Sequence, residues 1–215
     1  MHGFIDFTVV HWNIQGIVEK IDEVISLAVN TKADLIGLCE HWTSRENLSN
    51  IVIPGFTLAS AYHRPSGKRG GTALFLRSEL KNVELKYLVE LSIPSVCEVA
   101  AIYIADVNVV CLEIYRVPDY CNFNAFIECL HNVLNVLYFK NKSNASIIVS
   151  GDYNVDILGE DVQKYVFENL LMSYNLRNTV NEVTRPNLSG DGIGTCIDNI
   201  SVSVHSLFKD IIGLF

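Results

Sequence analysis

The spacing of apolar residues predicts a chain of many short strands and a few longer helices. Short apolar segments rich in β-branched residues predict strands at 5–12, 34–40, 57–63, 71–77, 97–104, 107–115, 146–151 and 194–204. Apolar residues that recur at helical spacing predict amphipathic helices at 18–30, 123–138 and 162–170. Because strands outnumber helices and often follow one another directly, this pattern predicts an α/β fold of mixed sheets with helices outside them.

Size and charge narrow the classes of protein that this chain can be. Its 215 residues suit one sizeable domain, 1–215, and an apolar content of 49% is enough for a packed core. The net charge of −8 argues against a dedicated nucleic-acid binder, but a metal ion and a local basic loop can still handle phosphate groups. We therefore expect a monomeric folded domain whose contacts with anions are local.

The cysteines and the N-terminus indicate an intracellular protein. The six cysteines form no C-x-x-C pair, so we expect buried thiols in a reducing compartment and no structural zinc. No basic and apolar leader begins the chain, and the acids Glu98, Asp106 and Glu113 interrupt the longest apolar stretch. These features predict a location in the nucleus or cytoplasm, without secretion and without membrane contact.

Polar residues gather where the predicted strands end. They are Asn13 and Gln15, Glu40, Tyr115, and Asp152 with Asn154. Residues two apart in a strand share a face, so we expect Asn13 to point with Gln15 and Asp152 to point with Asn154. A set of oxygen ligands without clustered cysteines or histidines suits a hard ion such as Mg²⁺ or Mn²⁺.

Each of these residues also has a structural interpretation. A single acid at the end of a strand is more often a cap or turn residue than a catalytic one. We interpret His11, His41 and His131 as structural, and Trp12 as a core residue under the site. The basic loop at 63–71, HRPSGKRGG, is either a solvated hairpin or a contact to a phosphate backbone through Lys68 and Arg69.

Seven short segments, taken in order, resemble one known superfamily. They are WNIQG (12–16), LCEHW (38–42), KRGGTALFLR (68–77), EIYRVP (113–118), VSGDYNVDI (149–157), VTRP (183–186) and TCIDNI (195–200). The chain resembles the endonuclease/exonuclease/phosphatase superfamily, which contains deoxyribonuclease I and the exonuclease III-type apurinic endonucleases. Within this superfamily, the segments YRVP, GDYNVDI and GTCIDNI are most similar to the corresponding segments in the endonuclease domain of insect non-LTR retrotransposons of the jockey and R-element type.

The resemblance implies a fold and a metal site. The fold would be a deoxyribonuclease I-like, four-layered α/β sandwich, in which two mixed sheets pack face to face with helices outside. Glu40 would be the main ligand of Mg²⁺ or Mn²⁺, with Asn13 beside it and Gln15 as a weaker helper. Thr184 and Arg185 of VTRP, together with the basic loop, would contact the DNA substrate.

The resemblance also implies catalytic roles. Asp152 would orient or deprotonate the attacking water, while Asn154 and Tyr115 would each hold a phosphate oxygen. Asp198 would support a histidine from a Ser-Asp-His segment further along the chain.

That histidine segment does not follow Asp198 in this sequence. His205 lies an odd number of positions further along the same predicted strand, so it should face away from Asp198. We therefore expect a chain that is truncated or has diverged before its last strand, with Asp198 left without a histidine partner and one sheet edge open.

The resulting hypothesis is a DNA-nicking endonuclease domain of a retrotransposon-derived protein, with a reverse transcriptase domain in a longer parent. Two alternatives stay open. One is a degenerate remnant with little or no activity, and the other is another phosphodiesterase or phosphatase of the same superfamily.

Overall fold

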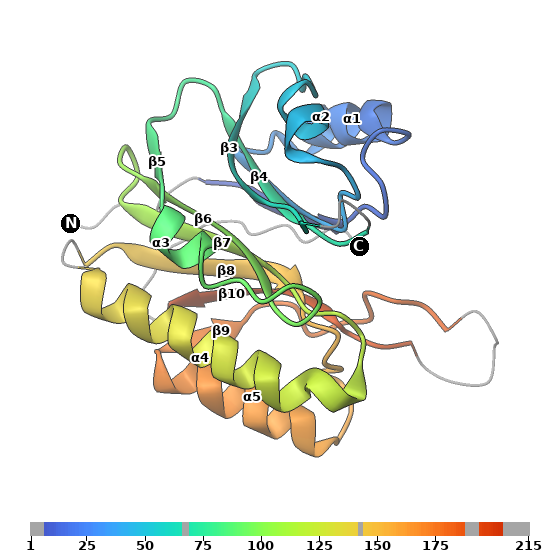
Figure 1. Ribbon diagram of the computed structural model, residues 1–215, viewed down its shortest axis with the longest axis vertical. Helices are drawn as coiled ribbons and strands as arrows, with labels where there is room; N and C mark the ends of the chain where they lie inside the picture. Colours follow the sequence, from blue (N-terminus) through green and yellow to red (C-terminus); the bar gives the residue numbers. More distant parts are fainter. Residues whose placement is uncertain (1–6, 66–68, 142–143, 188–193, 204–215) are drawn as a thin grey trace.

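The computed structural model describes residues 7–65, 69–141, 144–187 and 194–203, and it contains two β-sheets with helices on their outer faces (Figure 1). The first sheet has the strand order β1-β2-β4-β3, with β1 parallel to β2 and the other neighbours antiparallel. Its strands are β1 (Val9–Asn13), β2 (Leu35–Cys39), β3 (Phe56–Tyr62) and β4 (Thr72–Arg77).

The second sheet is larger and has the order β5-β6-β7-β8-β10-β9. Strands β7 and β8 are parallel, and every other neighbouring pair is antiparallel. Its strands are β5 (Asn82–Glu84), β6 (Glu98–Ile104), β7 (Val109–Tyr115), β8 (Ser146–Asp152), β9 (Leu176–Asn178) and β10 (Asp198–Ser203).

Helices cover the outer face of each sheet, so the chain forms four layers. Helices α1 and α2 lie on the first sheet, and α4 and α5 lie on the second, with the short α3 near its β5 edge (Figure 1). Their bounds are α1 (Ile21–Thr31), α2 (Arg45–Ser49), α3 (Lys86–Val89), α4 (Phe123–Lys140) and α5 (Val162–Ser173), with a 3₁₀ turn at Tyr120–Asn122. The predicted four-layered α/β sandwich is confirmed.

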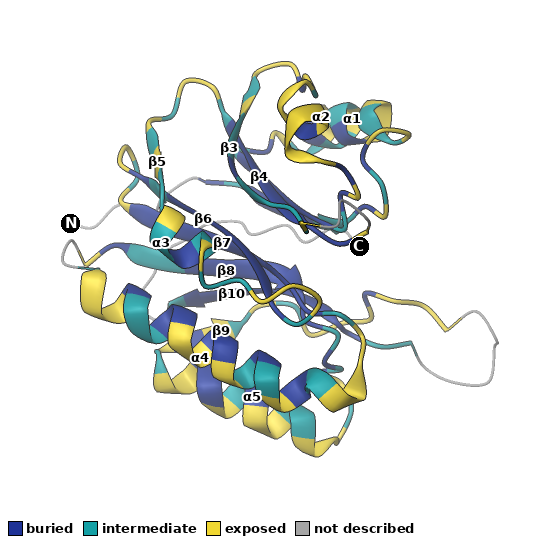
Figure 2. Ribbon diagram, in the orientation of Figure 1, coloured by how far each residue is buried: buried dark blue, intermediate teal, exposed yellow. Residues whose placement is uncertain are grey.

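Three apolar clusters hold these layers together. One joins α1 and α2 to the first sheet, one joins α3, α4 and α5 to the second, and one lies between the two sheets. Buried residues follow both sheets, while the outer faces of α4 and α5 are exposed (Figure 2). Burying this apolar area is the main driving force for stacking the layers. No helix within the described ranges is both long and apolar enough to cross a bilayer.

Some element boundaries differ from the prediction. The helix expected at 18–30 begins only at Ile21, because residues 17–20 form a turn in which the Lys20 N–H donates to the Ile17 carbonyl at 3.1 Å. Among the described residues, strand β1 pairs only with β2. The expectation for His205 and a missing last strand concerns residues outside the described part of the chain.

A buried polar link joins β1 of the first sheet to β7 and β10 of the second. His11 of β1 lies between two acids of the second sheet, with its Nδ1 2.6 Å from Glu113 Oε1 and its Nε2 3.2 Å from Asp198 Oδ1. The Ser150 hydroxyl donates to Glu113 Oε2 at 2.5 Å, and the Cys39 thiol donates to Glu113 Oε1 at 3.1 Å. His11 and Glu113 are fully buried, so these contacts replace the water that the charged groups lose.

Gly37 of β2 makes room for the Glu113 carboxylate. A Cβ atom at residue 37 would lie only 2.0 Å from Glu113 Oε2, so any larger residue would displace the buried acid. The glycine that interrupts the apolar strand at 34–40 is therefore explained by a contact with the opposite sheet.

We predict that Gly37→Ala lowers the free energy of unfolding by about 2–3 kcal/mol, because the new methyl group overlaps the Glu113 carboxylate. Urea unfolding followed by circular dichroism measures this loss. Gly55→Ala is the control: it has a left-handed φ of +81° but nothing within 4 Å of the added Cβ. Gly55→Ala should lower the free energy of unfolding by only about 1–2 kcal/mol, the strain of placing an alanine in the left-handed region.

The double variant Gly37→Ala/Glu113→Ala provides the sharper comparison. Its cost should be well below the sum of the two single costs, because the carboxylate that clashes with the added methyl group is gone. Costs that add to within about 0.5 kcal/mol would show that residue 37 does not act through Glu113.

Candidate active site at the ends of the two sheets

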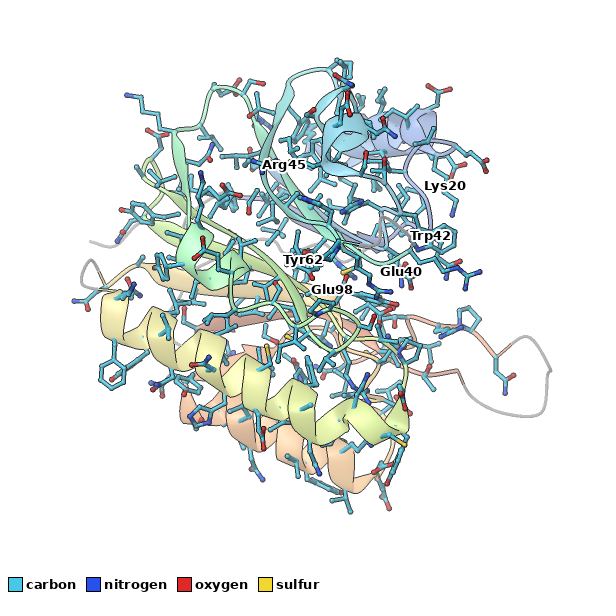
Figure 3. The ribbon with its side chains drawn as sticks, in the orientation of Figure 1. Lys20, Glu40, Trp42, Arg45, Tyr62 and Glu98 are labelled. Atoms are coloured by element: carbon cyan, nitrogen blue, oxygen red, sulfur yellow. The ribbon has the colours of Figure 1, made fainter. Side chains whose placement is uncertain are left out.

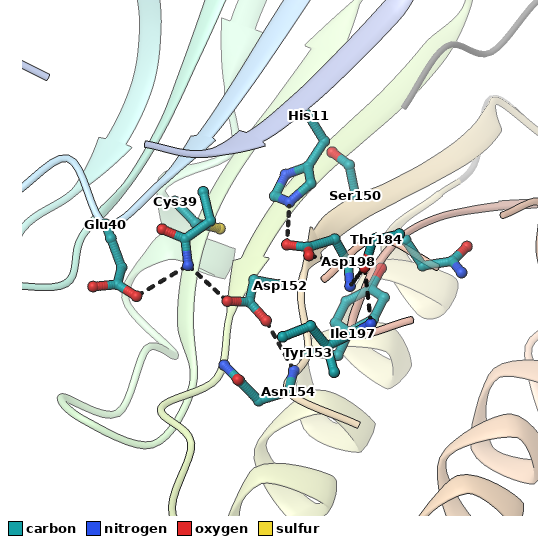
Figure 4. Close-up of polar contacts among 12 residues, drawn as sticks. His11, Cys39, Glu40, Ser150, Asp152, Tyr153, Asn154, Thr184, Ile197 and Asp198 are labelled. Atoms are coloured by element: carbon teal, nitrogen blue, oxygen red, sulfur yellow. Dashed lines mark hydrogen bonds and ion pairs between the residues drawn. The ribbon is translucent and has the colours of Figure 1, made fainter. Parts of the chain in front are cut away.

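Asn13 joins two acids that come from different sheets. Its Nδ2 donates to Glu40 Oε1 at 3.0 Å and to Asp152 Oδ2 at 2.7 Å. Glu40 and Asp152 point toward each other, and His11 and Asp198 lie beside Asp152 (Figure 4). The structure thus brings together three of the residues predicted from strand ends.

Strand pairing explains this convergence. Strands β1 and β2 are parallel and in register at Asn13 and Cys39, so Glu40 follows directly beside Asn13. Glu40 leaves the strand with a left-handed φ of 56°, and its N–H donates to the Gly71 carbonyl at 2.8 Å. Asp152 ends β8 on the opposite sheet, so the site lies where both sheets end.

Asp152 is buried at the end of its strand. Only 3% of its surface is exposed. Burial, and then the negative charge of Asp198, raise the pKa of Asp152 to about 7, although hydrogen bonds from Asn13 and Asn154 oppose this shift. The raised pKa means that these surroundings favour the protonated acid more than water does, so Asp152 can take up a proton close to neutral pH.

Asp198 contacts a histidine that the sequence prediction did not assign to it, His11 of β1, whereas the expectation about a Ser-Asp-His histidine concerns residues outside the described part of the chain. His11 lies 3.2 Å from Asp198 Oδ1, and the Thr184 hydroxyl donates to Asp198 Oδ2 at 3.1 Å. Burial alone would lower the pKa of His11, but the charge of Glu113 and hydrogen bonds to Asp198 and Glu113 outweigh it and raise the pKa to about 10. His11 is therefore an imidazolium near neutral pH, held between two acids.

Tyr115 reaches the site from the end of β7. Its strand neighbour in the parallel register is Asp152. Burial, and then the charge of Glu40 and a hydrogen bond to it, raise the pKa of Tyr115. The phenol therefore stays protonated and serves as a hydrogen-bond donor.

Asn154 does not share a face with Asp152 as the strand pattern predicted. Strand β8 ends at Asp152, and Asn154 follows in a turn with a left-handed φ of 47°, from which its backbone N–H donates to Asp152 Oδ1 at 3.0 Å. One N–H of its side chain donates to the Arg116 carbonyl at 2.7 Å, and Arg116 Nη1 donates back to the Asn154 carbonyl at 2.8 Å. The buried Arg116 thus fixes the loop that follows Asp152.

Gln15 likewise does not point with Asn13. Strand β1 ends at Asn13, and Gln15 is exposed with a φ of 47°. Side chains alternate between two faces only while the backbone is extended, and both Asn154 and Gln15 lie past the point where it stops being extended.

The predicted substrate-binding residues have different surroundings. Thr184 is buried, and its hydroxyl accepts the N–H groups of Ile197 and Asp198, so it supports Asp198. Arg185 is exposed and forms a β-bridge with Thr195. Arg69 is exposed, with its guanidinium 5.7 Å from the centre of the Trp42 ring, and Lys68 lies outside the described residues.

The atoms around Asn13 fit a hard cation. Asn13 Oδ1 is buried and has no hydrogen-bond partner, although Nδ2 of the same amide has two. An unpartnered amide oxygen beside the Glu40 carboxylate is the donor set that Mg²⁺ or Mn²⁺ takes. A second group of possible ligand atoms comes from His11, Cys39 and Glu113, and these atoms lie within 4.8 Å of one another. They already take part in hydrogen bonds, since His11 and Cys39 both contact Glu113 Oε1.

The sequence prediction missed Glu113, Cys39, Ser150 and Trp42 as residues of the site region. A charged residue inside the apolar strand at 107–115 was the available signal for Glu113, because an isolated buried acid needs a partner. Nothing in the local spacing identifies His11, Cys39 and Ser150 as the partners, since all three lie far from Glu113 in the sequence.

Solved structures with this fold come from several kinds of enzyme. The endonuclease domain of TRAS1, a telomere-specific non-LTR retrotransposon, superposes with a TM-score of 0.67 at 16% identity, covering 91% of this chain and 84% of that one. The 3′ phosphatase NExo from Neisseria bound to a product DNA hairpin also gives 0.67, at 14% identity, covering 91% and 86%. The AP endonuclease LMAP from Leishmania major gives 0.65 at 11% identity, covering 92% and 78%.

At these identities the structural matches establish the fold alone. A search of curated proteins finds no match to this chain. The family profile described as Endonuclease/Exonuclease/phosphatase family matches residues 10–203, which include the described residues of the site. The chain therefore belongs to the endonuclease/exonuclease/phosphatase family, a superfamily of metal-dependent nucleases and phosphatases.

Proposed function

We propose that this protein hydrolyses phosphodiester bonds in DNA with the help of a divalent cation. The observation that carries this proposal is the position of Asn13, which bridges Glu40 and Asp152 through Nδ2 and leaves a buried Oδ1 without a partner. Glu40 and Asn13 would hold Mg²⁺ or Mn²⁺, which would act as a Lewis acid on a phosphate oxygen.

The surrounding side chains match the needs of this reaction. Asp152 is placed to accept a proton from the attacking water, since its Oδ2 is fixed by Asn13 and its Oδ1 accepts the Asn154 N–H at 3.0 Å. Tyr115 and the second N–H of Asn154 are neutral donors that hold phosphate oxygens without adding negative charge. Asp198, fixed by His11 and Thr184, keeps a second negative charge next to Asp152.

Two further features support DNA as the substrate. Arg69 and Arg185 are exposed cations on loops near the site, suited to contacts with a phosphate backbone. Similar structures include a retrotransposon endonuclease domain and an enzyme bound to a DNA hairpin. We therefore propose that the chain nicks DNA as the endonuclease domain of a retrotransposon-derived protein.

We predict that Glu40→Gln weakens Mn²⁺ binding at least ~10-fold, because loss of a direct ligand should cost no less than loss of a residue that merely orients one. Isothermal titration calorimetry of the two proteins measures the difference. Glu46→Gln, an exposed acid in the first turn of α2, is the matched control and should bind like wild type. Equal Mn²⁺ affinity in Glu40→Gln and wild type would remove Glu40 from the metal site.

We also predict that Asp152→Asn lowers plasmid nicking in Mg²⁺ by ~10²-fold or more, the typical contribution of a positioned base. The substitution keeps the shape of the side chain, so the circular dichroism spectrum should not change. Asp161→Asn is the control, since Asp161 caps α5 by accepting the Gln163 N–H and Asn caps a helix equally well.

The same assay separates the alternatives. Supercoiled plasmid, a 3′-phosphorylated oligonucleotide and a sugar phosphate are offered in parallel to the wild-type protein. Release of phosphate without nicking would replace the endonuclease proposal with a phosphatase, and no reaction on any substrate would favour a degenerate remnant. Nicking that survives in Asp152→Asn would show that Asp152 is not the base.

A further inference from the structure

An exposed tryptophan stands directly beside the proposed metal ligand. Trp42 is 38% exposed, and its indole Nε1–H donates to Glu40 Oε2 at 2.9 Å. Glu40, Trp42 and Lys20 lie on the same side of the molecule (Figure 3). An aromatic ring is thus held next to the site while part of it stays accessible to solvent.

The backbone holds Trp42 in an unfavourable conformation. Its φ is 54° and that of Glu40 is 56°, in the left-handed region that bulky residues rarely adopt. The Trp42 N–H donates to the Gly70 carbonyl at 3.1 Å, which helps to fix the turn. Such conformations persist where surrounding contacts impose them, and they concentrate at functional sites.

Two neighbours shape the space around the ring. A Cβ atom at residue 16 would lie 3.2 Å from Trp42 Cε3, so the ring fits closely here because residue 16 is glycine. The Arg69 guanidinium lies 5.7 Å from the ring centre, within the range of a cation–π contact. An exposed indole with an arginine beside it is a combination that stacks on nucleobases.

We propose that Trp42 and Arg69 form a stacking platform for an unpaired nucleobase whose phosphate lies at Glu40. This inference rests on the proposed function and names the form of its substrate. A base in a duplex already stacks on its neighbours, so only an unpaired or extruded base can present its face to the ring. With a net charge of −8 the chain does not attract DNA as a whole, so such a local contact would contribute much of the affinity.

The first experiment uses Trp42 as its own reporter. The chain has two tryptophans, so Trp12→Phe leaves Trp42 as the only one. Its fluorescence is titrated in Mg²⁺, in an Asp152→Asn background that suppresses cleavage, with a short single-stranded oligonucleotide, and with an oligonucleotide of equal length whose central nucleotides are abasic. We expect quenching by both, with about tenfold weaker affinity for the abasic strand, the effect of losing one stacked base. Equal affinities would overturn the platform.

The second experiment separates stacking from the orientation of Glu40. Trp42→Phe and Trp42→Ala both lose the indole N–H that donates to Glu40, but only the alanine variant loses the ring. Stacking predicts that Trp42→Phe binds a fluorescein-labelled single strand within about threefold of wild type, and that Trp42→Ala binds it about tenfold more weakly. Equal losses in both variants would mean that Trp42 acts only through Glu40.

These measurements distinguish failure of the platform from failure of the proposed function. A wild-type protein that nicks plasmid DNA while Trp42→Ala binds single strands normally would overturn the platform alone. A wild-type protein that neither nicks nor binds DNA would overturn both. A Trp42→Ala defect confined to turnover of a sugar phosphate would show that the ring stacks on a sugar, which also contradicts the nucleobase platform.

Discussion

The arrangement of this protein depends on one buried histidine that joins its two sheets. His11 of β1 lies between Glu113 of β7 and Asp198 of β10, beside the apolar cluster that packs between the sheets. Three buried ionisable groups would be costly if any one lost its partner, whereas together they compensate for much of their lost hydration. Gly37 and Ser150 complete the link, one by leaving space for the Glu113 carboxylate and the other by donating to it.

On strands β1 and β7, the residues of this link lie two positions before residues of the candidate site. Asn13 follows His11 by two residues, and Tyr115 follows Glu113 by two, so each pair shares a face of its strand. Asp198 lies opposite Asp152 in the antiparallel register of β10 and β8. A contact that fixes the separation of the sheets at His11 therefore also fixes the distance across which Asn13 of the first sheet reaches Asp152 of the second.

Local patterns in the sequence predicted the layers better than they predicted the site. The long apolar strands and the helical face of α4 follow from side-chain periodicity, which is a local property. The short elements α2, α3, β5 and β9 were not predicted, because segments of three to five residues carry too little periodicity. The predicted orientations of the Asn154 and Gln15 side chains were wrong, because each residue lies just past the end of its strand.

The partner of Asp198 could not be predicted from the sequence for a different reason. His11 and Asp198 are separated by 187 positions, and only the packing of β1 against β10 brings them together. Glu113 is similar, since its partners come from three other strands. A charged residue inside an apolar strand shows that a partner must exist, but only the tertiary structure identifies it.

The most direct test of this account is the free energy of unfolding of His11→Ala, measured by urea titration. Removing the imidazolium leaves Glu113 and Asp198 buried without their shared cation, so a loss of about 3–5 kcal/mol is expected. His131→Ala, an exposed histidine on α4, should change stability by less than about 1 kcal/mol. A loss in His11→Ala no larger than that of His131→Ala would contradict the claim that this link holds the two sheets and the site together.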